Sequence, residues 1–231
     1  SSYNLELLNS QYFRSVSVRA DIANRKDNQV QILVELLEHA SNTYEVGIGY
    51  LSDVGMRGKV SWTKPWLNRY GHRVSAAIEY SRVQQEYTFS YDIPLEDPVV
   101  NIARIQAGLQ RKDNADTDTE IYTVKFQRQY ELSSRSLRTW FIKWERERYT
   151  QGLQQDQSLM ILPGISFARA RKKGGFDPHK GYQHLFSIEF ADQIWGADVD
   201  MAKLQTHSKL VYSIDKTYFF ITRLDLGAIW V

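Results

Sequence analysis

Cysteine is absent from the 231-residue sequence, which excludes a disulfide framework, a thiolate metal site and a cysteine nucleophile. Long apolar runs are absent too, since no stretch approaches the roughly 18–20 uninterrupted apolar residues of a membrane-spanning helix. Neither charge sign dominates, because 29 Lys and Arg stand against 27 Asp and Glu for a net charge of +2. The sequence therefore has no basic face of the kind that binds nucleic acid, and we expect no nucleic-acid partner.

Metal-binding and catalytic patterns are also missing. The five histidines lack metal-ligand spacing with a second histidine. One acidic cluster could hold calcium, but its spacing is not that of an EF-hand, so we interpret it as a solvated loop. Its members are Asp113, Asp116, Asp118 and Glu120. No nucleophile elbow, phosphate loop or acid–base pair is found, and we predict no cofactor, no metal site and no enzymatic activity.

Aromatic residues, by contrast, make up 13% of the chain, with 14 Tyr, 10 Phe and 6 Trp. Membrane proteins are rich in such residues at their interfacial belts. The mean hydropathy of −0.47 is typical of a soluble protein. A strand that is apolar on one face only has a low mean hydropathy even in a membrane barrel, so this value does not separate the two classes.

From residue 43 onward, apolar and polar residues alternate with a period of two, which indicates β-strands. We expect about eleven strands of about 9–14 residues, against roughly 5–6 in soluble sheets, and such strands can cross a bilayer when tilted. The alternate face is too polar for a soluble interior. It includes Arg104, Lys125, Gln127, Lys143, Glu145, Glu189, Lys203, Lys209, Arg223 and Asp225. An outward apolar face around a watery lumen suits every strand, so the pattern favours a transmembrane antiparallel β-barrel.

The connections between the expected strands tend to alternate between short and long. Two polar segments, 111–119 and 148–158, are expected to be longer, extracellular loops. Shorter turns are predicted on the other side, at 65–71, 94–98, 132–135 and 213–217.

Residues 1–41 follow a different pattern. Apolar residues recur at helical spacing over 3–13, which predicts an amphipathic helix. A short strand at 16–18, a polar turn over 21–28 and a second strand over 30–36 follow. So few elements cannot bury a core alone, and we interpret them as the second half of a small α/β domain. The first residues do not form a signal peptide, so we expect the chain to begin inside a longer protein.

Four short segments carry a resemblance to a known family. They read GIGYLSDVG (47–55), KPWLNRYGH (64–72), FSYDIPL (89–95) and GGFDPHKG (174–181). They resemble the barrel of the TamA family, the outer-membrane subunits of the translocation and assembly module, which are relatives of the barrel-assembly protein BamA. The segment LLNSQYF (7–13), with the strands after it, resembles the end of a polypeptide-transport-associated (POTRA) domain. The resemblance divides the chain into residues 1–41, the C-terminal part of a POTRA domain, and residues 42–231, the N-terminal part of an outer-membrane β-barrel.

This resemblance implies a sixteen-stranded barrel in the bacterial outer membrane, with the N-terminal segment in the periplasm. It implies the assembly and insertion of autotransporters and other β-barrel proteins. The implied partners are outer-membrane lipid, unfolded barrel or autotransporter substrates, and a TamB-like inner-membrane protein that spans the periplasm. The family's returning loop with an Arg-Gly-Tyr or Arg-Gly-Phe motif is absent, as are its closing strands, so we expect this chain alone to be neither a closed barrel nor an active one.

The first barrel strand of this family pairs weakly with the last strand and acts as a lateral gate. The resemblance places this role on Tyr44, Val46, Gly47, Ile48, Gly49 and Tyr50. Glycines weaken a strand and permit bends, and an exposed strand edge can template an incoming strand. The alternative is that the two glycines only make room for bulky neighbours inside the barrel.

Two further groups of residues are expected near the membrane surface. Girdle residues that anchor a barrel at the interface are expected at Trp62, Trp66, Tyr91, Trp140 and Trp144. A basic run near a strand end either contacts anionic headgroups or forms a solvated turn. It comprises Arg169, Arg171, Lys172 and Lys173.

Three other functions stay open on the sequence. A two-partner-secretion-type translocation pore of the same superfamily would differ in the returning loop and the last strands. A passive porin-like channel would not need the POTRA-like front. A soluble β-rich carbohydrate-binding module would account for the many Trp and Tyr residues but not for the length of the strands.

Overall fold

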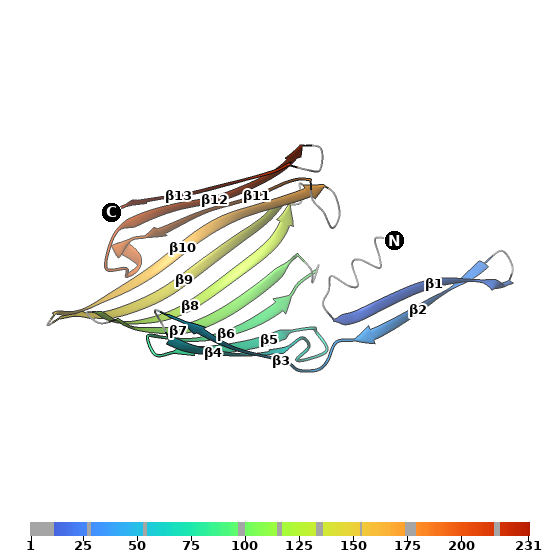
Figure 1. Ribbon diagram of the computed structural model, residues 1–231, viewed down its shortest axis with the longest axis horizontal. Helices are drawn as coiled ribbons and strands as arrows, with labels where there is room; N and C mark the ends of the chain where they lie inside the picture. The colour runs from blue at the N-terminus through green and yellow to red at the C-terminus, as the bar shows by residue number, and fades with distance from the viewer. Residues whose placement is uncertain are drawn as a thin grey trace.

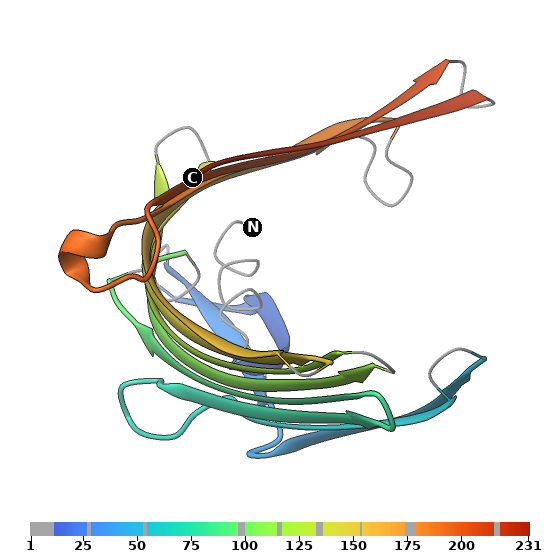
Figure 2. The ribbon, with the colours of Figure 1, turned by 90° about the vertical axis from the view of Figure 1, so that its left-hand side faces the viewer.

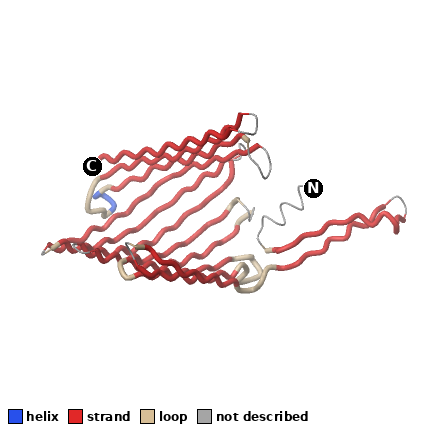
Figure 3. The backbone as a smooth tube through the Cα atoms, viewed as in Figure 1, coloured by secondary structure: helices blue, strands red, loops and turns tan. Residues whose placement is uncertain are grey.

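Strands make up almost all of the structure, a computed structural model that describes residues 12–26, 29–52, 55–96, 100–114, 117–132, 136–152, 154–173, 179–214 and 218–231 (Figures 1 and 3). The strands are β1 (Phe13–Lys26), β2 (Gln29–Glu38), β3 (Thr43–Leu51), β4 (Gly55–Lys64), β5 (Arg73–Ser81), β6 (Gln84–Pro94), β7 (Ile102–Asn114), β8 (Thr117–Leu132), β9 (Ser136–Gln151), β10 (Gln154–Lys173), β11 (Lys180–Ala191), β12 (Met201–Ile214) and β13 (Tyr218–Trp230). A single 3₁₀ turn, η1 (Gln193–Trp195), lies between β11 and β12 in this described part of the chain.

The strands form two separate sheets. β1 and β2 pair as an antiparallel ribbon, and β3 to β13 form one eleven-stranded sheet, called the wall here, in chain order. Each strand of the wall is antiparallel to its neighbours, and the ladders run without a register shift. Figure 2 shows that the wall curves into an open trough. The predicted antiparallel sheet of about eleven strands is confirmed, and within the described residues it does not close.

The two faces of the wall differ in polarity and in exposure. Side chains converge on the concave face of a curved sheet and diverge on its convex face, so exposure distinguishes the two. The side chains of Lys143 and Glu189, which share one face, are 20% and 15% exposed. Trp140 and Ile142, on the other face, are 51% and 55% exposed. The charged face is therefore concave and the aromatic face convex, as the alternation predicted.

The hairpins at the end of the wall away from the ribbon are longer than the sequence suggested. Most of the described residues of the segments 111–119 and 148–158 belong to strands and not to loops. β7 continues to Asn114 and β8 begins at Thr117, while β9 continues to Gln151 and β10 begins at Gln154. Ladder hydrogen bonds are made by the backbone, so polar strands can extend beyond an apolar band. β10 reaches 20 residues in this way.

The connection between β11 and β12 folds against the first half of β10. Asp192 caps η1, since its side chain accepts a hydrogen bond from the backbone N–H of Ile194 at 2.8 Å. Trp195 donates from Nε1 to the carbonyl of Ile161 at 3.0 Å. These contacts hold the connection at a small buried cluster in a wall that is otherwise one layer thick. The cluster comprises Leu162, Ala191 and Ala197.

The expected N-terminal helix cannot be compared with the structure. Residues 1–11 lie outside the described part of the chain, and Phe13, which the expected helix over 3–13 included, belongs to β1. No helix among the described residues is long and apolar enough to span a membrane.

The predicted polar turn over 21–28 is wrong for residues 21–26. β1 continues to Lys26, which pairs with Gln29 of β2, and residues 27 and 28 lie outside the described part of the chain. The ladder shifts its register between Asp21 and Lys26. A bulged strand leaves residues out of the regular ladder and tolerates polar side chains, so its sequence is easily read as a turn.

Candidate functional site

β3 lies at one edge of the wall (Figure 1). It pairs with β4 from Thr43–Thr63 to Leu51–Gly55. No strand in the described part of the chain pairs with its other edge. Its convex side chains are largely exposed, and Ile48 reaches 81%. All six predicted gate residues therefore lie on an edge with unpaired backbone groups, which can accept a further strand. Their role as a gate stays a prediction.

The two glycines of β3 are bordered by side chains of β4 that can move. A Cβ built at Gly47 would meet Lys59 Cβ at 3.9 Å, an ordinary contact. A Cβ at Gly49 would lie 3.3 Å from Nε of Arg57, the far end of a flexible side chain. Close packing therefore does not require glycine at either position, which favours the interpretation that the glycines weaken the strand. A shallow hollow of about 260 Å³ lies over them on the wall.

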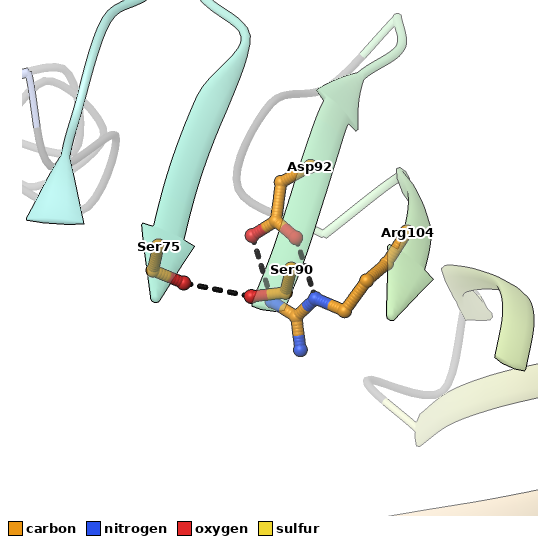
Figure 4. Close-up of polar contacts among 4 residues, drawn as sticks. All are labelled: Ser75, Ser90, Asp92 and Arg104. Atoms are coloured by element: carbon orange, nitrogen blue, oxygen red, sulfur yellow. Dashed lines mark hydrogen bonds and ion pairs between the residues drawn. The ribbon is translucent and has the colours of Figure 1, made fainter. Parts of the chain in front are cut away.

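Polar contacts tie three successive strands together on the concave face (Figure 4). Arg104 of β7 donates from Nε and Nη2 to the two carboxylate oxygens of Asp92 on β6, at 2.5 and 2.8 Å. The hydroxyls of Ser75 on β5 and Ser90 on β6 lie 2.7 Å apart. The side chain of Asp92 is only 10% exposed, so the bidentate pair is held within the surface of the wall. The sequence placed Arg104 on the polar face but gave no indication of its partner.

Further along the concave face, opposite charges again lie in pairs. Lys143 Nζ lies 3.3 Å from Glu145 Oε2 and 3.5 Å from Glu189 Oε2. His207 Nδ1 also lies 2.8 Å from Asp225 Oδ1, a contact that is an ion pair only when the imidazole is protonated. Paired charges of this kind make a hydrated, nearly neutral surface, and none of these groups flanks a nucleophile as an acid–base pair does.

Phe141 is an aromatic exception on the concave face. Its ring lies over Gly164, where a Cβ would stand 2.7 Å from Phe141 Cε2 and 2.8 Å from the carbonyl oxygen of Ile188. Lys125 Nζ lies 4.3 Å from the ring centroid, within range of a cation–π contact. Gly164 therefore provides the space in which the ring and the ammonium group stack.

Tyr12, directly before β1, joins the ribbon to the wall. Its hydroxyl donates to the carbonyl of Gly71 at 3.0 Å, and its ring meets Trp66 edge-on at 6.2 Å between centroids. The backbone N–H of His39 donates to the Tyr12 carbonyl at 3.0 Å. Burial raises the pKa of the Tyr12 phenol above its ordinary value, and the positive charge of Arg73 partly opposes this. The contact fixes the start and the end of the ribbon to the β4–β5 connection.

Sequence reasoning missed this junction, because Tyr12 was assigned to a helical pattern. The one available signal was the segment 64–72, which combines two aromatic residues and a glycine in a connection rather than in a strand. The residues of such a segment can pack against another part of the chain, but nothing in the sequence indicates which residue they contact.

The five expected girdle residues fall into two groups. Trp62, Tyr91, Trp140 and Trp144 lie on strands and share the convex side of the ladders. Trp140 donates from Nε1 to the hydroxyl of Tyr130 at 3.0 Å. Trp66 lies instead in the β4–β5 connection against Tyr12. The interfacial position of these residues stays a prediction, and Trp66 has a partner inside the protein.

No group of three metal-ligating side chains occurs among the described residues. Within the acidic cluster of the sequence, Glu120 accepts a hydrogen bond from Arg111 Nε at 2.7 Å. Asp116 lies outside the described residues. Glu120 is therefore an ion-pair partner on the convex face rather than a free ligand.

Comparison with known proteins agrees with this architecture. The solved structure of BamA from Haemophilus ducreyi lacking POTRA domains 1–3 superposes with a TM-score of 0.76 over 98% of this chain. The match spans 48% of that protein, and at 12% identity it shows a common fold. The model of the Omp85 superfamily domain matches residues 42–231, which are the whole of the wall and more than half of the chain. The chain therefore belongs to the Omp85 superfamily.

Proposed function

We propose that this chain is part of a TamA-type protein that assembles and inserts autotransporters and other β-barrel proteins into the bacterial outer membrane. Members of the Omp85 superfamily are transport and assembly proteins rather than enzymes. The observation that carries the proposal is the position of β3, the first strand of the superfamily domain, at an edge of the wall with which no described strand pairs.

In the proposed mechanism, β3 is the lateral gate. An incoming unfolded strand pairs with its free edge through backbone hydrogen bonds, which do not depend on the sequence of the substrate. Gly47 and Gly49 keep the pairing weak enough to exchange, because glycine stabilises a strand less than other residues do. The paired charges of the concave face keep the lumen wet while polar substrate side chains pass.

The ribbon is proposed to be the C-terminal part of a periplasmic POTRA domain. Both of its faces carry exposed apolar side chains in β2, such as Ile32, Leu33 and Leu37. Exposed apolar residues of this kind suit contact with further protein. A TamB-like inner-membrane protein is the proposed periplasmic partner, and outer-membrane lipid surrounds the convex face.

Disulfide capture in cells tests the gate. A cysteine at Ile48 on β3 is paired with a cysteine in the last strand of a model autotransporter, expressed together with the protein. Ile78 on β5 is the matched control, since it lies on the same convex face, is exposed, and belongs to a strand that is paired on both sides. We expect an adduct at Ile48→Cys and none at Ile78→Cys.

Other outcomes point to the other functions. A substrate that reaches the medium without an adduct at β3 indicates a secretion pore. Conductance to small solutes without an effect on barrel assembly indicates a passive channel. Either result overturns the assembly function.

A further inference from the structure

Arginines gather on the convex face of the wall, near the end where the ribbon attaches. They are Arg128 on β8, Arg138 on β9 and Arg169 and Arg171 on β10, and together they are called the arginine belt. Each lies within four residues of the end of its strand on that side. Arg128 pairs with Trp140 and Arg138 with Phe167, so the belt shares the face of the aromatic residues.

The members of the belt are diagonal neighbours across three strands. Arg138 lies opposite Tyr130 on one neighbouring strand and opposite Phe167 on the other. Arg128 is two positions from Tyr130, and Arg169 is two positions from Phe167. Diagonal neighbours in a sheet stand roughly 7–8 Å apart, within reach of long side chains. Three guanidinium groups can thus converge on one small ligand.

Among the described residues, no acidic side chain forms an ion pair with the belt. Nε of Arg138 and Nε of Arg169 are covered by protein and have no hydrogen-bond partner in the described part of the chain. At the other end of the same face, by contrast, Arg111 is paired with Glu120 at 2.7 Å. The four arginines of the belt thus have no acidic partner of this kind in the described part of the chain.

Aromatic side chains hold the central arginine in place. Arg138 donates from Nη1 to the hydroxyl of Tyr130 at 3.2 Å, and its guanidinium carbon lies 5.0 Å from the centroid of the Phe167 ring. Trp140 donates to the same Tyr130 hydroxyl at 3.0 Å. A guanidinium that is oriented before a ligand arrives loses less entropy on binding, and its planar fork matches the oxygens of a phosphate.

An apolar groove of about 700 Å³ adjoins the belt on the convex face. Arg128 belongs to both the belt and the groove, and Trp140, its cross-strand partner, also lines the groove. The groove continues away from the strand ends past Phe126, Ile142 and Pro163. Its volume is within the usual range of roughly 300–1,000 Å³ for small-molecule sites. A cationic rim beside an apolar groove matches a ligand with an anionic head and a hydrocarbon tail.

We propose that the belt and the groove bind an anionic phospholipid, with its phosphodiester at Arg128, Arg138 and Arg169 and an acyl chain along the groove. The convex face of a membrane barrel lies against lipid, so the ligand is present at high local concentration. Arginine on that face is strongly destabilising at the bilayer midplane but costs little near the interface, where the strand ends lie. Basic clusters at this depth attract anionic headgroups.

The test measures lipid binding to the intact protein purified in neutral detergent, by native mass spectrometry. Phosphatidylglycerol, phosphatidylcholine and inorganic phosphate are the three probes. The R138Q/R169Q variant removes two charges from the belt, and R146Q/R148Q removes two charges from the same face of β9 at its other end. We expect the belt variant to bind phosphatidylglycerol about tenfold more weakly, because it loses charge-assisted hydrogen bonds to the phosphodiester. The R146Q/R148Q variant should bind like the wild type.

A second variant keeps the proposal testable if R138Q/R169Q fails to fold. Ala103→Phe fills the groove without altering any charge, because Ala103 lines it directly opposite Arg128. We expect it to weaken phosphatidylglycerol binding. The proposal would be overturned if phosphatidylcholine bound as tightly as phosphatidylglycerol, or if the two arginine variants lost the same affinity for phosphatidylglycerol. Full displacement of the lipid by inorganic phosphate would overturn it too.

Discussion

The hydroxyl of Tyr12 and the carbonyl of Gly71 lie 3.0 Å apart, although 59 positions separate them in the chain. Gly71 has a φ of +74°, which L side chains rarely adopt, and a Cβ there would lie 2.9 Å from Tyr12 Cζ and closer still to its hydroxyl oxygen. Both the backbone and the neighbour thus require glycine at this position. At this contact between the ribbon and the wall, even the methyl group of an alanine would be badly tolerated.

Replacing Gly71 with alanine should release the ribbon from the wall. Gly152→Ala is a matched control, because Gly152 has a φ of +61° but nothing within 4 Å of a built Cβ. Both variants lose about 1–3 kcal/mol to backbone strain, and only G71A also loses the Tyr12 hydrogen bond, worth about 0.5–1.5 kcal/mol. Limited proteolysis at residues 39–42 should therefore be faster in G71A than in G152A. Equal cleavage would show that Tyr12 does not anchor the ribbon.

The Tyr12 junction should weaken in alkali. Its phenol has a pKa raised by burial above the ordinary value of about 10, so the folded state holds this proton more tightly than the unfolded state does. The stabilising contribution is complete below the unfolded pKa and is lost as pH rises through the higher folded pKa. Tyr12→Phe lacks it at every pH. The difference in urea midpoint between wild type and Y12F should be constant around neutral pH and should shrink at strongly alkaline pH. A difference that persists there would contradict the assignment.

The Asp92–Arg104 pair should contribute more than the exposed pair on neighbouring strands. A double-mutant cycle with D92N and R104Q should give a coupling energy of about 1.5–3 kcal/mol in urea unfolding, because the pair is bidentate and Asp92 is mostly covered. Arg57 and Glu79, 4.0 Å apart and exposed, are the control pair. Their cycle should give about 0–1 kcal/mol. Similar values for the two cycles would show that the solvated lumen screens both pairs alike.

Alternation along the chain was enough to predict the wall, because each residue of a strand faces the side opposite to its neighbours. It placed Arg104 and Lys143 on the polar face correctly. It could not predict that Arg104 meets Asp92, since a cross-strand contact depends on register, which the turns determine. It also treated the polar ends of β9 and β10 as a loop, because side-chain polarity indicates where the apolar band stops and not where the backbone ladder stops.

Gly164→Ala should disturb the concave face through Phe141. The added Cβ would stand 2.7 Å from Phe141 Cε2 and 2.8 Å from the Ile188 carbonyl, so the ring and the Lys125 stack must move. Overpacking of this kind costs about 1–3 kcal/mol. Gly108→Ala is the control, since its Cβ would come no closer than 3.8 Å to the Tyr87 carbonyl. Urea unfolding should show G164A clearly less stable than G108A, and equal stabilities would mean that Phe141 moves at no cost.

The glycines of β3 offer the last prediction, which bears on the gate. Each Gly→Ala change in a strand should add about 0.5–1 kcal/mol of local stability, so G47A/G49A should protect the β3 amides from hydrogen exchange. Arg57 can move aside for the methyl group at position 49, so packing does not cancel this gain. If β3 must exchange partners, the same variant should capture less autotransporter substrate. Gly58→Ala is the control, because it adds a methyl group in open space on β4, which is paired on both sides. Protection of β3 with unchanged substrate capture would separate strand stability from function and place the gate elsewhere.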